Sequence, residues 1–150
     1  MKTTNRPLIS ILLLGLLALG SGSALAENAM DFGDYVVHYN ALGTDFLSPD
    51  VAKHYGITRS KNRAMINVSV MKKAMGLAGQ PVKATVTARA TNLNGQTKSL
   101  EVREIDEQTA IYYIAEFPVV NQETLDFTVE VTPAGETPKT VTFRQQFFTD

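Results

Sequence analysis

The sequence contains no cysteine and no tryptophan, and it has only two histidines. Without cysteine the chain can form no disulfide, no thiolate metal site and no cysteine nucleophile. Its stability must therefore come from side-chain packing alone. Zinc-protease, calcium-loop and glycine-rich phosphate-loop patterns are also missing from the sequence. These absences argue against an enzyme, and we expect no cofactor.

An excess of one charge is likewise missing. The chain has 14 basic and 15 acidic residues, for a net charge of −1. A balance of this kind is not typical of proteins that bind nucleic acids or anionic membranes. We therefore expect no nucleic-acid partner.

Long apolar runs are confined to the N-terminus. Lys2 and Arg6 precede an apolar run at residues 8–19, and Ala24 and Ala26 form a small-x-small cleavage site. This run is shorter than the roughly 20 residues that a membrane-spanning helix needs. The pattern predicts a signal peptide at residues 1–26, cleaved after Ala26, and export of the rest. Residues 27–150 suit a single domain without a transmembrane segment.

Alternation of apolar and polar residues predicts strands in most of the exported chain. An apolar stretch at 110–117 predicts a central strand, and glycine and proline predict a loop at 73–81. Ile105 is out of phase with Leu100 and Val102, so we expect a bulge or strand end near residues 103–104. The other predicted strands cover residues 34–40, 64–71, 82–90, 125–131 and 141–147.

About seven strands joined mostly by short turns predict an all-β fold. The favoured architecture is an antiparallel, immunoglobulin-like β-sandwich, and an up-and-down barrel is the alternative. One short helix is expected near residues 49–55. Ser48 is a suitable N-cap, Gly56 suits the C-terminal left-handed position, and Val51 and Tyr55 are expected to dock the helix.

A basic segment follows the helix and contains Arg59, Lys61, Asn62 and Arg63. If the next strand extends back this far, the three cations point to one side and could bind a carboxylate, a phosphate or an acidic partner. The alternative is a solvated face whose cations pair within the molecule. The candidate acidic partners are Glu101, Glu104, Asp106 and Glu107.

Soft metal ligands form the second candidate site. Thioethers suit Cu(I), which is plausible for an exported protein, and histidine is a common metal ligand. Core filling by methionine and structural roles for the histidines are the commoner alternatives. The candidate ligands are His38, His54, Met71 and Met75, and Met65 shares a strand face with Met71.

The sequence also resembles a known family. The carrying residues are 39–42, 46–52, 55–57, 112–118 and 143–147, and above all the segment Arg59-Ser60-Lys61-Asn62-Arg63. They resemble small exported proteins of Gram-negative bacteria known as domain of unknown function 4426. The resemblance implies a periplasmic β-sandwich, and it implies no activity and no catalytic residues.

The sequence thus favours a non-enzymatic binding module of the cell envelope, with an envelope protein as its partner. A periplasmic carrier of copper or of a small molecule is the alternative. A hydrolase is least supported, because no nucleophile and base can be paired from their spacing. Nothing in the sequence indicates the oligomeric state.

Overall fold

The structure is a computed structural model that describes residues 28–75 and 77–150. The predicted signal peptide at residues 1–26 lies outside the described residues. Within them, no helix has the length and apolar character needed to cross a membrane.

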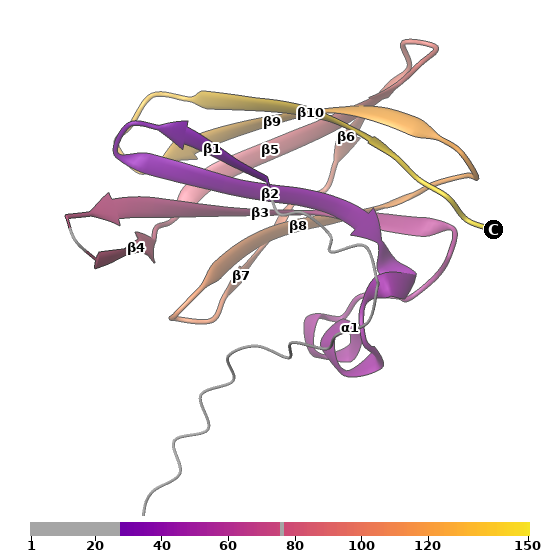
Figure 1. The fold of residues 1–150 in the computed structure, drawn as a ribbon, viewed down its shortest axis with the longest axis horizontal. Coiled ribbons are helices and arrows are strands. Elements are labelled where there is room, and N and C mark those ends of the chain that lie inside the picture. Colours follow the sequence, from indigo (N-terminus) through magenta and orange to yellow (C-terminus); the bar gives the residue numbers. More distant parts are fainter. Residues whose placement is uncertain (1–27, 76) are drawn as a thin grey trace, which may run out of the picture.

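The described residues form ten strands and two short helical segments (Figure 1). The helical segments are the 3-10 helix η1 (Thr44–Phe46) and the α-helix α1 (Pro49–Tyr55). The strands are β1 (Asn28–Phe32), β2 (Tyr35–Gly43), β3 (Arg63–Ala74), β4 (Leu77–Pro81), β5 (Ala84–Asn92), β6 (Thr97–Leu100), β7 (Arg103–Asp106), β8 (Ile111–Pro118), β9 (Thr124–Pro133) and β10 (Lys139–Gln146).

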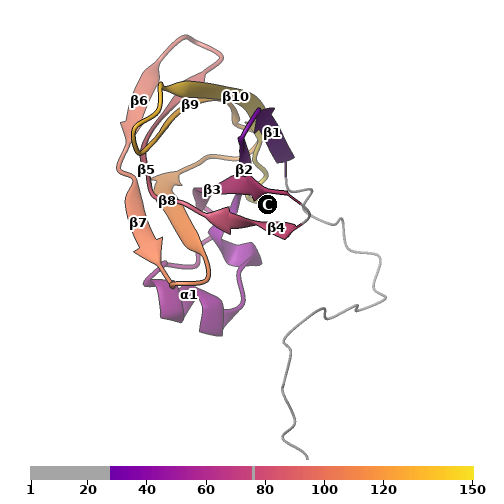
Figure 2. The same ribbon diagram turned by 90° about the vertical axis from the view of Figure 1, so that its left-hand side faces the viewer.

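The strands form two antiparallel sheets that face each other. The larger sheet has the order β1-β2-β3-β8-β7, and β4 pairs with the far end of β3; the smaller sheet has the order β10-β9-β5-β6. Figures 1 and 2 show the smaller sheet on one side of the larger sheet and α1 on the other. The predicted all-β sandwich is confirmed, and the chain forms two sheets rather than the closed barrel of the alternative.

Apolar side chains from the facing sheets fill the interior of the sandwich. Phe127 is 1% exposed and stacks on Phe143 with ring centroids 4.8 Å apart, while Phe117 packs against it at 5.5 Å. The hydroxyl of Tyr113 accepts a hydrogen bond of 2.8 Å from the N–H of Ala84, which joins the two sheets. This interior supplies the stability that the missing disulfides cannot.

Two strands, β1 and β4, lie where no strand was predicted. β1 has no apolar alternation, but it pairs with β2 along its whole length. The expected loop at residues 73–81 is wrong, because β4 pairs with the end of β3. Gly79 allows this pairing: a Cβ there would lie 3.1 Å from the carbonyl oxygen of Lys72. Pro81 is tolerated because it is the last residue of an edge strand.

The break expected near residues 103–104 lies at residues 101–102 instead, and it is a change of sheet. β6 ends at Leu100 in the smaller sheet, and β7 begins at Arg103 in the larger sheet. The change places Ile105 on the outer face of the larger sheet, where it packs in a second apolar cluster. Its phase differs from that of Leu100 because the two residues belong to different sheets.

Candidate functional site

Helix α1 has the ends that the sequence predicted. Ser48 caps it by accepting a hydrogen bond of 3.2 Å from the N–H of Val51. Gly56 has φ 65°, a left-handed conformation that glycine adopts at little cost, and its N–H binds the carbonyl oxygens of Ala52 and Lys53. Seven residues are too few for a stable isolated helix, so α1 depends on its contact with the sheet.

The docking residues differ in part from the prediction. Ala52 is 3% exposed and lies at the contact with the sheet, whereas Val51 is 41% exposed. Tyr55 is partly buried against the same cluster. The small Ala52 side chain lets the helix lie close, and it leaves a hollow beside it that Val51 and Tyr55 border.

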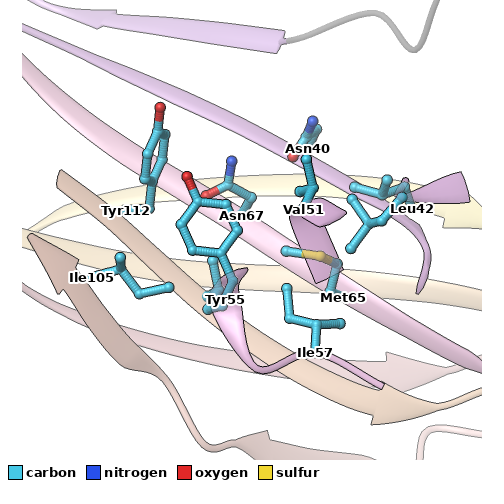
Figure 3. Close-up of a pocket in the computed structure, with 11 residues that line it drawn as sticks. Asn40, Leu42, Val51, Tyr55, Ile57, Met65, Asn67, Ile105 and Tyr112 are labelled. Carbon is cyan, nitrogen blue, oxygen red and sulfur yellow. The ribbon is translucent and has the colours of Figure 1, made fainter. Parts of the chain in front are cut away.

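We call this hollow the α1 pocket. It has a volume of about 250 Å³ and lies between α1 and the outer face of the larger sheet (Figure 3). Apolar side chains make up most of its wall. Its lining residues are Asn40, Leu42, Leu47, Val51, Tyr55, Ile57, Met65, Asn67, Ile105, Tyr112 and Ile114.

Two asparagines stand out in this apolar wall. Asn40 of β2 and Asn67 of β3 are opposite each other in the strand register. The side-chain oxygen of each is buried and has no hydrogen-bond partner. An unpaired buried polar atom costs about 1–3 kcal/mol of stability. Two such atoms side by side point to a role outside folding.

Two tyrosines lie on the same side of the pocket as the asparagine amides. The rings of Tyr55 and Tyr112 meet edge to face with centroids 6.3 Å apart. Figure 3 shows their hydroxyls and both amides directed to one side, with Ile57 and Met65 opposite. Burial, and then the Glu107 carboxylate nearby, raise the pKa of Tyr55 to about 12. The pocket thus has an apolar side and a polar side.

The basic segment does not form one strand face. β3 begins only at Arg63, so Arg59 and Lys61 precede it in a loop and turn. Arg63 contacts Glu116 at 3.5 Å, and Arg59 donates a hydrogen bond of 3.0 Å to the carbonyl oxygen of Asp45. The shared direction expected for the three cations is therefore not found.

Three of the four acidic residues named as internal partners of the basic segment pair with other residues. Glu104 and Asp106 contact Lys83 at 3.1 and 3.3 Å. Glu107 contacts His54 at 3.0 Å. Neither Arg59 nor Lys61, both exposed, has a carboxylate partner among the described residues.

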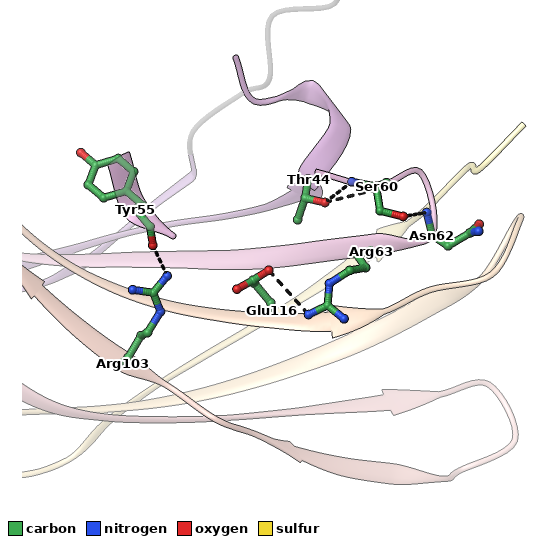
Figure 4. Close-up of polar contacts among 7 residues, drawn as sticks. All are labelled: Thr44, Tyr55, Ser60, Asn62, Arg63, Arg103 and Glu116. Atoms are coloured by element: carbon green, nitrogen blue, oxygen red, sulfur yellow. Dashed lines mark hydrogen bonds and ion pairs between the residues drawn. The ribbon is translucent and has the colours of Figure 1, made fainter. Parts of the chain in front are cut away.

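A buried threonine fixes the loop that carries these cations. Thr44 of η1 is fully buried, and its hydroxyl both donates to the carbonyl oxygen of Ser60 and accepts from the N–H of Ser60, at 3.2 and 3.0 Å. The Ser60 hydroxyl accepts from the N–H of Asn62 (Figure 4), whose carbonyl oxygen accepts from Val119. These bonds give Lys61 a defined position although it lies outside a strand.

Lys61 lines a groove of about 360 Å³ together with two exposed aromatic side chains. Phe46 is 68% exposed and Phe148 is 66% exposed. We call these three residues and the groove between them the Phe46–Phe148 surface. Seven phenylalanines occur in the chain, and the two most exposed in the described part border one groove.

The candidate metal ligands do not converge. His54 is on α1, and Met75 is fully exposed in the turn after β3. Figure 1 shows the C-terminal end of β3 far from α1. His38 and Met71 do lie on one face, because their partners in the β2–β3 register are Ser69 and Val36. No cluster of three or more histidine or acidic side chains suited to a metal occurs among residues 28–75 and 77–150.

Sequence reasoning missed Asn40, Asn67 and Thr44. The two asparagines are 27 positions apart in the sequence, and only the strand register brings them together. The out-of-phase Ile105 was the one visible sign that residues beyond β6 pack on the outer face of the larger sheet. Thr44 gave no sign, because nothing local indicates that its hydroxyl binds Ser60.

Comparison with known proteins places the chain in a family. It is similar to a crystal structure of a DUF4426 family protein from Pseudomonas aeruginosa, at 42% identity and a TM-score of 0.71 over 83% of this chain and 96% of that one. No curated protein matches it in sequence.

The fold is also similar to FetP of uropathogenic Escherichia coli strain F11, recombinantly expressed in the periplasm, at 12% identity. The TM-score is 0.58 over 85% of this chain and 98% of that one. A copper-bound variant of FetP gives 12% identity and a TM-score of 0.57 over 80% and 93%. At this identity the similarity concerns the fold alone. The model of the domain of unknown function DUF4426 matches residues 29–150, and the chain belongs to that family.

Proposed function

We propose that this protein is a non-enzymatic binding module of the periplasm that docks an envelope protein at the Phe46–Phe148 surface. The observation that carries the proposal is the exposure of Phe46 and Phe148, each about two-thirds exposed beside one groove. Apolar side chains gathered at a groove are typical of protein-interaction sites, whereas single exposed apolar residues are not. The signal peptide expected at residues 1–26 supports the location.

Charge defines the chemistry of the partner. Lys61 lines the groove, and Arg59 is tied to the carbonyl oxygen of Asp45, the residue before Phe46. Neither cation has a carboxylate partner in the described part of the chain, while nearby Glu123 is bound to the N–H of Val120. An acidic segment with an apolar side chain would complement both the cations and the groove.

Site-specific crosslinking in intact cells tests this proposal. A photoreactive phenylalanine analogue replaces Phe148, and the matched control replaces Leu93, which is 68% exposed at the β5–β6 turn. We expect one discrete product from position 148, with the crosslinked partner peptide carrying aspartate or glutamate beside an apolar residue. The R59E/K61E double variant should lose the product, and Lys98→Glu should keep it.

Several crosslinking results would contradict the proposal. Equal products from positions 148 and 93 would show that exposure alone causes the crosslinks. A second copy of this chain, or a partner peptide without acidic residues, would contradict the proposed chemistry. A product that survives reversal of both charges would do the same.

A copper carrier is the second candidate. His38 and Met71 are diagonal neighbours on one sheet face, a distance that long side chains can bridge, and imidazole and thioether both bind copper. Titration of Cu(I) into the purified domain should raise its thermal midpoint. His38→Ala or Met71→Leu should abolish the shift, whereas Met75→Leu should not. An unchanged midpoint in the parent domain would remove this candidate.

A further inference from the structure

We infer that the α1 pocket is a second binding site, and that its ligand is a small apolar molecule bearing a protonated amine. The pocket is separate from the surface proposed above: Leu42 is the one residue that lines both hollows. The inference therefore stands or falls independently of the partner protein.

The volume of the pocket and its apolar wall determine the size and apolar character of the ligand. Its volume of about 250 Å³ is below the roughly 300–1,000 Å³ of sites for drug-sized ligands. Leu42, Ile57, Met65 and Ile114 give it an apolar wall. A single ring or a short branched chain fits such a space, and its burial supplies about 25 cal/mol per Å² of apolar surface.

The unpaired atoms set the second requirement. The side-chain oxygens of Asn40 and Asn67 are hydrogen-bond acceptors that are buried without a donor. Among the described residues, no lining side chain of the pocket has a buried donor in the same situation. The two oxygens therefore lack donors, although the amide nitrogens and the tyrosine hydroxyls of the same wall are donors themselves. A ligand can bring the missing donors, and an ammonium group brings three.

The surrounding charges favour a cation over a neutral donor. The rings of Tyr55 and Tyr112 lie beside the amides, and aromatic faces attract cations. The Glu107 carboxylate is near the Tyr55 hydroxyl. Arg103 donates to the carbonyl oxygen of Tyr55, and Arg63 contacts Glu116 (Figure 4). No lysine, arginine or histidine lines the pocket, so a carboxylate ligand would meet no cation in its wall.

Three probes of equal size separate these contributions. Benzylamine, benzyl alcohol and benzoate share one ring and differ in the polar group. We expect benzylamine to bind about tenfold more tightly than benzoate, because the ammonium group brings donors to the two buried acceptors and the carboxylate brings only further acceptors. Benzyl alcohol should lie between them. The measurement is a titration followed by ¹H–¹⁵N NMR, in which the side-chain amide signals of Asn40 and Asn67 should shift.

Two variants test the role of the amides. Asn67→Leu and Asn40→Leu each keep a similar shape and remove one acceptor, and each should reduce the preference for benzylamine over benzoate to about threefold or less. Asn94→Ala, at the exposed β5–β6 turn, should leave the preference unchanged. A circular dichroism melt confirms that each variant is folded.

Three results would overturn the inference. Tighter binding of benzoate would show that the amides present donors to the pocket. Equal binding of all three probes would show that the amides select nothing. Shifts that appear only outside the pocket would show that it is not a site for amines, and none of these results bears on the crosslinking at Phe148.

Discussion

The two faces of the larger sheet differ in how well their buried side chains are packed and hydrogen-bonded. On its inner face, Val37, Val68 and Val70 are no more than 1% exposed and pack against the smaller sheet without a polar atom among their side chains. On its outer face, Asn40 and Asn67 occupy the same two strands and leave two acceptors unpaired under α1. Packing on the inner face stabilises the fold, whereas the unpaired asparagine oxygens on the outer face lower the free energy of unfolding.

This difference between the two faces indicates where a functional site lies in a domain whose sequence has no catalytic motif. Polar atoms buried without partners reduce the free energy of unfolding, so two of them side by side indicate a site. Among the described residues three side-chain atoms are in this situation: the oxygens of Asn40 and Asn67 in the pocket, and Nε of Arg63 outside it. Among the described residues, Thr44 of η1 is the buried polar residue, and its hydroxyl both donates and accepts a hydrogen bond. In the pocket, by contrast, the side-chain oxygens of Asn40 and Asn67 have no hydrogen-bond partner.

Truncation of the aromatic core should produce the largest effect. Phe127→Ala removes a ring that stacks on Phe143 and contacts Phe117 and Phe147. We expect a loss of about 3–5 kcal/mol in the free energy of unfolding, because a cavity remains. Urea denaturation followed by circular dichroism measures it. A loss below about 1 kcal/mol would mean that the interior does not carry the stability assigned to it.

Loss of the Thr44 hydroxyl should have the next largest effect. Thr44→Val keeps the shape and leaves the N–H and carbonyl oxygen of Ser60 without this partner. We expect a loss of about 1–3 kcal/mol, together with weaker crosslinking at Phe148, because Lys61 loses its defined position. The free energy comes from urea denaturation. Thr142→Val, at an exposed position of β10, is the matched control and should be close to neutral.

Removal of the Ser48 cap should destabilise α1, which covers the pocket, without changing the packing between the two sheets. Ser48→Ala deletes the acceptor for the Val51 N–H and should cost about 1 kcal/mol. Hydrogen exchange should become faster at the amides of Ala52 in α1 and of Gly56 at its C-terminal cap, while the amides of β3 and β8 keep their protection. Equal loss of protection in the helix and the strands would contradict the view that α1 is a separable cover.

The stability contributed by Tyr55, which lines the pocket, should depend on pH. Burial raises the pKa of Tyr55 to about 12, above the ordinary value near 10 for an unfolded chain. The unfolded state therefore loses this proton first, and the stability contributed by protonated Tyr55 is complete below pH 10 and falls as the pH rises toward 12. Tyrosinate absorbance measures the titration. Tyr55→Phe should remove the step nearest pH 12, and a Tyr55 that titrates near 10 would refute its burial.

The sequence was a good guide where the signal is local. The ends of α1 were predictable because Ser48 and Gly56 act within one helical turn, and β3, β5 and β9 were predictable because one face of each is buried. Family membership was also visible, since the segment 59–63 is unusual.

The sequence was a poor guide where pairing decides the structure. β4 contains Gly79 and Pro81, which argue against a strand, and forms because the end of β3 offers an unpaired edge. The basic residues were expected on one strand face because their spacing fits a strand, but the turn held by Ser60 delays β3 until Arg63. The pocket depends on the register between β2 and β3, which no local pattern contains.

The most direct test of this account is the free energy of unfolding of Asn67→Leu in urea, compared with the parent domain. If Asn67 is kept for binding, its replacement removes an unpaired acceptor and should stabilise the fold by about 1 kcal/mol. Ser69→Leu, on the same face of β3 but outside the pocket, controls for the general effect of leucine in a strand. A parent domain that is more stable than Asn67→Leu would show that this asparagine serves the fold, and the claim that the outer face gives up stability for a ligand would be wrong.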